Sequence, residues 1–191
     1  MTNQEARHFT FGPSALATPA NAVTIARLLA APVFVFMIVV WGATWFNLAV
    51  GLIVAGSDGV DGWMARRHGT TRSGAFLDPL ADKAVVLGAL IALAIEGHLP
   101  WFPVILITAR EVGMQVYRSF AGRRGVSIPA RNSAKLKTIV QDMAIGTCIT
   151  PPLVHHHGVQ LTVIWVAAAL TLLSGLQYLV DGRRAFKEAG A

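Results

Sequence analysis

The chain has 191 residues, of which 54% are hydrophobic and 14% are charged, and its mean hydropathy is +0.55. This composition excludes an ordinary soluble domain of this size and predicts an all-α integral membrane protein. The net charge of +6 would suggest a nucleic-acid-binding protein only if the basic residues covered a soluble surface, and their positions argue otherwise.

Six stretches of the sequence are long and apolar enough to cross a bilayer, which takes about 20 residues per helix. We expect a six-helix domain over residues 21–182, between a cytoplasmic N-terminal arm at 1–20 and a cytoplasmic tail at 183–191. The fifth stretch is the most polar of the six. The predicted transmembrane helices cover residues 22–41, 44–66, 75–96, 99–120, 134–154 and 159–180.

Basic residues mark one face of the predicted membrane domain. The connections after the first, third and fifth helices contain no Lys or Arg, whereas the other connections and both ends of the chain are rich in them. Cytoplasmic loops retain positive charge, so we expect both termini on the cytoplasmic side. The positive charge then meets anionic lipid head groups, and no nucleic-acid partner is expected.

Four of the ten acidic residues lie close together around the second connection, at Asp58, Asp61, Asp78 and Asp82. The first two are three residues apart and the last two are four apart, so each pair shares one face of a helix. Four converging carboxylates repel one another unless cations compensate them. Two ions of Mg²⁺ or Mn²⁺ would do so, since these hard cations prefer oxygen ligands and often act on phosphates.

Two other interpretations of the four aspartates need no bound metal. They could form salt bridges at the membrane surface with neighbouring basic residues, or they could relay protons in a cation or proton carrier. The basic residues available for such salt bridges are Arg66, Arg67, Arg72 and Lys83.

The segment around the aspartates resembles the signature of the CDP-alcohol phosphatidyltransferase family. That signature reads Asp, two residues, Asp-Gly, two residues, Ala-Arg, a short gap, Gly, three residues, Asp, three residues, Asp. All eight of its fixed positions are present, and the gap between Arg66 and Gly74 has seven residues. The fixed positions fall on Asp58, Asp61, Gly62, Ala65, Arg66, Gly74, Asp78 and Asp82.

This resemblance implies an activity and a role for each signature residue. Asp58, Asp61 and Asp78 would be the principal metal ligands, and Asp82 would complete the binuclear site and act as general base on the acceptor hydroxyl. The CDP-diacylglycerol donor would bind against five signature positions and release CMP. The resemblance further implies six spanning helices, a homodimer, and an active site on the cytoplasmic side of a bacterial plasma membrane. The donor-binding positions are Asp58, Gly62, Ala65, Arg66 and Gly74.

The acceptor has to be inferred from basic residues outside the signature. A phosphorylated acceptor needs several cations, because a dianion that leaves water requires charge-assisted partners. The candidates are Arg110, Arg118, Lys135 and Lys137. Alternatively, the last three are ordinary anchors on the positive membrane face. Arg110 does not fit that alternative, because it lies eight residues deeper than Arg118 and Glu111 follows it.

Two segments resemble the branch of the family that uses sn-glycerol 3-phosphate as acceptor. They are Ala-Arg-Glu at 109–111 and Lys-Leu-Lys-Thr at 135–138, the latter followed by Gln141. Two other acceptors stay open, namely phosphatidylglycerol, which would give cardiolipin, and inositol phosphate.

Three features outside these segments carry less weight. His155, His156 and His157 are consecutive residues on a short connection, and we do not expect all three to ligate one metal. Asp142 is either a hydrogen-bond partner in helix packing, which we favour, or a residue that lines a cavity. Cys148, the one cysteine, is expected to pack inside a helix bundle.

Overall fold

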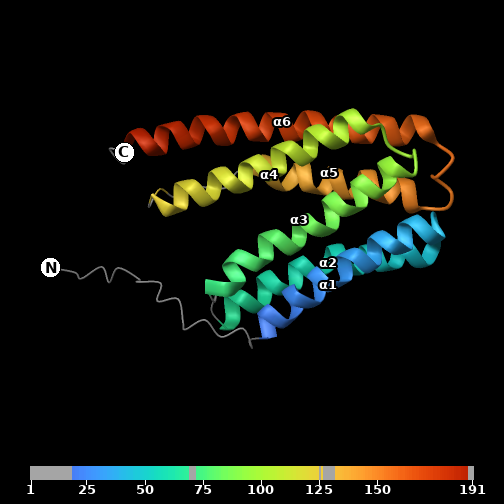
Figure 1. Ribbon diagram of the computed structural model, residues 1–191, viewed down its shortest axis with the longest axis horizontal. Coiled ribbons are helices and arrows are strands. Elements are labelled where there is room, and N and C mark those ends of the chain that lie inside the picture. Colours follow the sequence, from blue (N-terminus) through green and yellow to red (C-terminus); the bar gives the residue numbers. More distant parts are fainter. Residues whose placement is uncertain (1–18, 69–71, 125, 127–131, 189–191) are drawn as a thin grey trace.

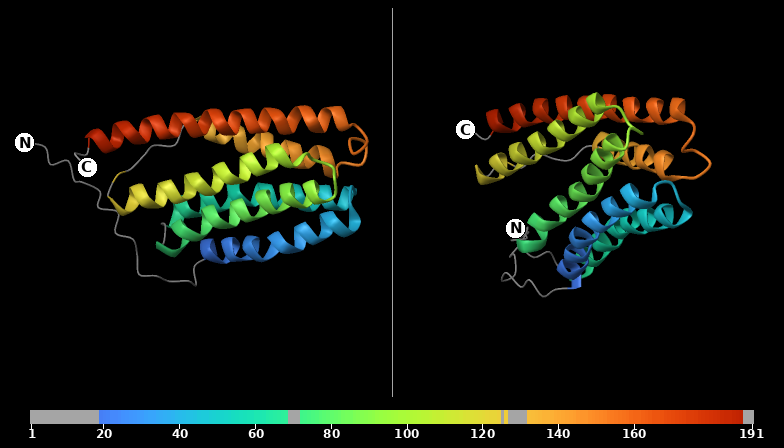
Figure 2. Two further views of the ribbon diagram at one scale, coloured as in Figure 1. Left: turned by 45° about the horizontal axis from the view of Figure 1, so that its top comes forward. Right: turned by 45° about the vertical axis from the view of Figure 1, so that its right-hand side comes forward.

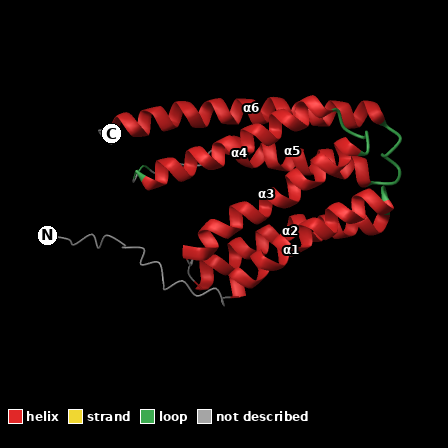
Figure 3. Ribbon diagram, viewed as in Figure 1, coloured by secondary structure: helices red, strands yellow, loops and turns green. Residues whose placement is uncertain are grey.

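A computed structural model describes residues 19–68, 72–124, 126 and 132–188, and these residues form six α-helices and no strand (Figure 3). Within helices, only the backbone is described at 19–23, 58–68, 72–79, 82, 132, 133 and 188. The helices are α1 (Pro19–Trp41), α2 (Trp45–His68), α3 (Arg72–Ile95), α4 (Trp101–Arg123), α5 (Asn132–Ile149) and α6 (His157–Glu188).

The prediction of an all-α chain is confirmed, and each predicted span coincides with one helix. The largest differences are at the C-terminal ends of α5 and α6. Helix α5 ends at Ile149 and not at residue 154. Pro151 and Pro152 follow that end, and proline cannot donate the backbone hydrogen bond that would continue a helix. By contrast, α6 continues to Glu188, into the segment predicted to be a tail.

The connections alternate between the two ends of the bundle. Those at 42–44, 96–100 and 150–156 lie at one end, whereas α1 begins and α6 finishes at the other (Figures 1 and 2). Helix α1 packs against α2 and α3, and α6 packs against α4 and α5. Helix α3 joins these two groups, because it also contacts α4 and α5.

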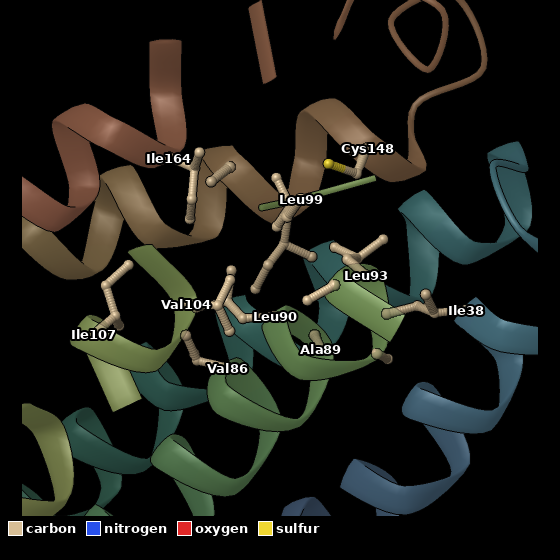
Figure 4. Packing of buried hydrophobic residues seen from close by; sticks show 14 of the residues in the cluster. Ile38, Val86, Ala89, Leu90, Leu93, Leu99, Val104, Ile107, Cys148 and Ile164 are labelled. Atoms are coloured by element: carbon tan, nitrogen blue, oxygen red, sulfur yellow. The ribbon is translucent and has the colours of Figure 1, made fainter. Parts of the chain in front are cut away.

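The hydrophobic core surrounds α3. Leu90 of α3, Ile107 of α4 and Ile164 of α6 are fully buried, and Figure 4 shows them within one cluster. Cys148 of α5 belongs to the same cluster and is 1% exposed, as the sequence predicted. Helices α1 and α3 approach closely at Gly88, where an added Cβ would lie 2.9 Å from Val35 Cγ2.

The outer surface of the bundle is unusually apolar. Large hydrophobic side chains on all six helices are exposed, among them Leu29, Ile53, Phe102 and Leu176. Soluble monomers rarely expose contiguous apolar surface on this scale. Within the described residues, two helical segments are long and apolar enough to cross a membrane, at Thr24–Trp41 and His157–Lys187. The apolar helical segments Trp45–Ser57 and Lys83–Ile95 are shorter.

Candidate active site

The four aspartates occupy matching positions on two consecutive helices. Helix α2 carries Asp58 and Asp61, and α3, which runs in the opposite direction, carries Asp78 and Asp82 (Figure 1). Only three residues separate the end of α2 at residue 68 from the start of α3 at residue 72, so these helix ends lie within about 15 Å of each other.

The depth of each aspartate follows from the rise of a helix, about 1.5 Å per residue. Asp58 lies ten residues before the end of α2 and Asp82 ten residues after the start of α3, which places each about 15 Å from its helix end. Asp61 and Asp78 lie about 10 Å from those ends. The backbone therefore carries the two pairs at the same depth, although the four side chains lie outside the described part of the structure.

The other signature positions belong to the same helical hairpin. Gly62, Ala65 and Arg66 lie on α2 between Asp61 and its C-terminal end, and Gly74 lies in the first turn of α3. Their side chains, too, are outside the described residues.

A side-chain hydrogen bond joins helix α1 to α2 immediately before the first aspartate. Arg27 is 4% exposed, and its Nε donates a hydrogen bond to Ser57 Oγ at 3.1 Å. Ser57 Oγ in turn donates to the Val54 carbonyl oxygen at 2.7 Å. A buried cation is costly unless it is paired or hydrogen-bonded, so this contact holds the guanidinium beside the turn of α2 that contains Asp58.

A cavity of about 130 Å³ opens between α1, α2, α3 and α5. Its walls are mostly apolar and include Phe34, Val86 and Ile145, whereas Arg27 and Asp142 contribute polar groups. It is large enough for several water molecules or methylene groups. Asp142 thus lines a cavity, which is one of the two roles that the sequence suggested for it. The side-chain period of α5 turns Asp142 and Ile145, three residues apart, to the same face.

Three of the described basic residues gather around one buried carboxylate. Glu111 of α4 is 4% exposed, and its Oε1 lies 2.8 Å from Arg110 Nη1 and 2.5 Å from Lys137 Nζ of α5. Its Oε2 lies 3.3 Å from Lys83 Nζ of α3. Lys83 Nζ also donates to the Glu111 backbone carbonyl oxygen at 3.0 Å. One carboxylate thus joins cations from three helices.

The Arg110 guanidinium is held on its other side by α6. Its Nη2 donates to Ser174 Oγ at 3.0 Å, and a Cβ added at Gly175 would lie 3.0 Å from its Nε. That Nε is buried and has no hydrogen-bond partner among the described residues. Glycine at 175 therefore makes room for Arg110 to cross between α4 and α6.

The four predicted acceptor residues do not all belong to this cluster. The structure brings together Arg110 and Lys137. Arg118 is exposed, with its guanidinium 5.6 Å from the centre of the Tyr178 ring, and Lys135 is exposed on the first turn of α5. Lys83 takes part instead, although in the sequence it looked like one more basic residue at the cytoplasmic face. Its position directly after Asp82 was the available signal.

Two polar features near these helices have structural partners. Gln141 Nε2 donates to Thr171 Oγ1 at 2.9 Å, which joins α5 to α6 inside the bundle. His157 Nδ1 lies 3.2 Å from Gln160 Oε1, and His155 and His156 are exposed. The described side chains contain no group of three or more His, Cys, Asp or Glu residues that could hold a metal ion.

Comparison with known proteins identifies the family. Residues 17–173 match the sequence profile of CDP-alcohol phosphatidyltransferase. The chain belongs to the CDP-alcohol phosphatidyltransferase family. This confirms the family resemblance of the signature and establishes the chain as a member of a family of transferases.

Curated relatives cover nearly the whole chain. A protein of Mycobacterium tuberculosis (strain H37Rv) named "Probable phosphatidylglycerophosphate synthase" is 38% identical over 94% of this chain and 87% of its own length. Proteins named "CDP-diacylglycerol--glycerol-3-phosphate 3-phosphatidyltransferase" are similar too. The one from Cereibacter sphaeroides is 32% identical over 83% of this chain and 92% of its own. The one from Shigella flexneri is 34% identical over 84% and 92%.

Proposed function

We propose that this protein is a phosphatidylglycerophosphate synthase, which transfers the phosphatidyl group of CDP-diacylglycerol to sn-glycerol 3-phosphate and releases CMP, in phospholipid biosynthesis. Family membership supports the reaction class and the CDP-linked donor. The names of the relatives support glycerol 3-phosphate as acceptor.

The observation that favours a phosphorylated acceptor is the cluster around Glu111. Its three cations and one carboxylate have a net formal charge of +2. A phosphate monoester carries a charge of about −1.5 to −2 at neutral pH, and so complements the cluster closely. Phosphatidylglycerol is a phosphodiester with a single negative charge and complements it less well. Inositol phosphate has the same charge as glycerol 3-phosphate, and only the relatives' names separate these two acceptors.

The donor set on α2 and α3 fits two divalent cations. Asp58, Asp61, Asp78 and Asp82 offer only carboxylate oxygens, at matching depths on one hairpin, and hard cations such as Mg²⁺ or Mn²⁺ take such ligands. When bound, these ions would polarise the phosphates and stabilise negative charge on the leaving group.

The residues of this chain then have distinct tasks. Arg110 and Lys137 hold the acceptor phosphate, with Arg118 and Lys135 at the exposed approach to it. Asp82 accepts the proton of the acceptor hydroxyl as the oxygen attacks the lipid-linked phosphorus. A new bond forms between that oxygen and phosphorus, and the bond to the bridging oxygen of CMP breaks. Arg66, with Gly62, Ala65 and Gly74 beside it, binds the cytidine diphosphate part.

We place the active site at the cytoplasmic face of a bacterial plasma membrane, with all six helices spanning it. The exposed apolar side chains support contact with membrane lipids. Trp41, Trp45 and Trp101, all about half exposed or more, lie at the bundle end opposite the aspartates, where aromatic rings favour the bilayer interface. Residues 1–20 would be the cytoplasmic arm, 183–191 the cytoplasmic tail, and the enzyme a homodimer.

A parallel acceptor assay tests this proposal. Purified protein is given CDP-diacylglycerol and Mg²⁺ or Mn²⁺ with glycerol 3-phosphate, inositol phosphate, phosphatidylglycerol or serine in separate reactions, and CMP is measured. We expect the fastest CMP release with glycerol 3-phosphate, its loss with EDTA, and its recovery when the metal is restored. Faster release with another acceptor would reassign the substrate. Ion or proton flux in liposomes without any CMP release would instead identify a carrier.

A further inference from the structure

Glu111 is the one acidic side chain in the described cation cluster, and the proposed reaction gives it no task. It forms ion pairs with Lys83 of α3, Arg110 of α4 and Lys137 of α5, and it is nearly inaccessible to solvent. Two of these cations are the proposed phosphate ligands. The third directly follows the proposed general base in the sequence.

One carboxylate oxygen fixes the distance between the two phosphate ligands. Arg110 Nη1 and Lys137 Nζ both bind Glu111 Oε1, at 2.8 and 2.5 Å, so their nitrogens cannot lie farther apart than these two lengths allow. Buried cations without this shared partner would repel each other and separate. A phosphate group that approaches them instead meets two donors that already converge.

The other carboxylate oxygen faces the catalytic helix. Lys83 Nζ lies 3.3 Å from Glu111 Oε2 and donates to the Glu111 backbone carbonyl at 3.0 Å, so it is bound to this residue twice. Since Lys83 is next to Asp82 on α3, this double contact sets the position of that part of α3 relative to α4. Glu111 thereby connects the proposed phosphate ligands with the helix that carries the proposed base.

We propose that Glu111 is a positioning residue, which holds Arg110 and Lys137 together for the acceptor phosphate and, through Lys83, aligns the Asp82 segment of α3 with that phosphate. The inference rests on the proposed function, because it presupposes a phosphorylated acceptor. Glu111 touches neither substrate itself and acts through its three partners.

The first test removes the negative charge of the Glu111 side chain and keeps its shape. In Glu111→Gln, we expect the KM for glycerol 3-phosphate to rise about tenfold, because charge-assisted hydrogen bonds to both ligands are lost, and the KM for CDP-diacylglycerol to change less than about twofold. Glu111→Asp keeps the charge on a shorter side chain and should give an intermediate KM. Glu96→Gln makes the same chemical change at an exposed position in the 96–100 connection and should leave both constants unaltered.

The second test separates the contact of Glu111 with Lys83 from its contacts with Arg110 and Lys137. In Lys83→Met, we expect kcat to fall about tenfold, since the alignment of α3 is lost. The KM for glycerol 3-phosphate should rise less than in Glu111→Gln, because one positive charge is lost but both phosphate ligands remain. Lys187→Met, at an exposed position near the end of α6, is the matched control. The thermal unfolding midpoint of each variant shows how much of any loss comes from unfolding.

Three outcomes with Glu111→Gln would overturn the inference. A lower KM for glycerol 3-phosphate in Glu111→Gln would mean that the carboxylate competes with the acceptor, and equal changes in both KM values would mean that it only supports the fold. If Glu111→Gln does not fold, Glu111→Asp and Lys83→Met carry the test. Wild-type protein that releases no CMP with any phosphorylated acceptor refutes the proposed function, whereas an active wild type with an unaffected Glu111→Gln refutes only the positioning role.

Discussion

Among single residues, two groups of charged residues stand out in the apolar bundle. The four aspartates occupy the α2–α3 hairpin, and the basic side chains of Lys83, Arg110 and Lys137 surround Glu111. Charged groups at such positions are costly in a membrane domain, so their presence indicates a functional role.

Asp82→Asn tests the assignment of the general base. The amide has nearly the same size but cannot accept the hydroxyl proton, so we expect kcat to fall by a factor of about 10² to 10⁴. The measurement is CMP release at saturating donor and acceptor, with the unfolding midpoint as a check on folding. Turnover near the wild-type rate would remove Asp82 from the base role.

Arg110→Ala tests the acceptor site. It removes hydrogen bonds to Glu111 Oε1 and Ser174 Oγ together with one proposed phosphate contact. We expect the KM for glycerol 3-phosphate to rise about tenfold to a hundredfold, and the KM for CDP-diacylglycerol to change little. Arg183→Ala, at an exposed position of α6, is the control. Equal effects on the two substrates would argue against a role in acceptor binding.

At the scale of the helices, close approach depends on small residues at a few positions. Gly88 lets α1 reach α3, and Gly175 lets Arg110 lie against α6. A glycine inside a helix costs roughly 0.5–1 kcal/mol relative to alanine. Glycine at these two positions therefore lowers helix stability but permits the close contacts.

Gly175→Ala separates the effect of this glycine on the position of Arg110 from its effect on helix stability. The new Cβ would lie 3.0 Å from Arg110 Nε, and Arg110 cannot retreat freely because Glu111 and Ser174 hold its other nitrogens. We expect the KM for glycerol 3-phosphate to rise about threefold while the unfolding midpoint does not fall. Gly113→Ala in α4 meets no atom within 4 Å and should raise stability without a change in KM. An unchanged KM in Gly175→Ala would mean that Arg110 is free to adjust.

At the scale of the whole molecule, the alternation of connections gives the bundle two chemically different ends. The 42–44, 96–100 and 150–156 connections contain no Lys or Arg, whereas the opposite end carries the aspartates and most of the basic residues. The proposed membrane-spanning orientation, with the aspartate end in the cytoplasm, would account for this difference.

Single-cysteine labelling tests that orientation. Cys148 is buried and can be replaced by alanine, after which His156→Cys and Lys187→Cys each place one thiol at opposite ends of the bundle. In intact cells, we expect a membrane-impermeant thiol reagent to label residue 156 and not residue 187, with the reverse result in inverted vesicles. Labelling of both positions from one side would contradict the six-span arrangement.

The helices could be predicted from the amino-acid sequence, because long apolar runs that end at Pro151 or at polar connections are compatible with few other structures. The family could be recognised as well, because the eight fixed positions of the signature lie within one short segment, from Asp58 to Asp82, and their resemblance to the family pattern needs no long-range information. Which cations meet could not be predicted in this way. Lys83, Arg110 and Lys137 are far apart along the chain, and their convergence on Glu111 depends on how α3, α4 and α5 pack. For the same reason Arg118 and Lys135, equally basic in the sequence, lie outside that cluster, and Asp142 faces a cavity that exists only between packed helices.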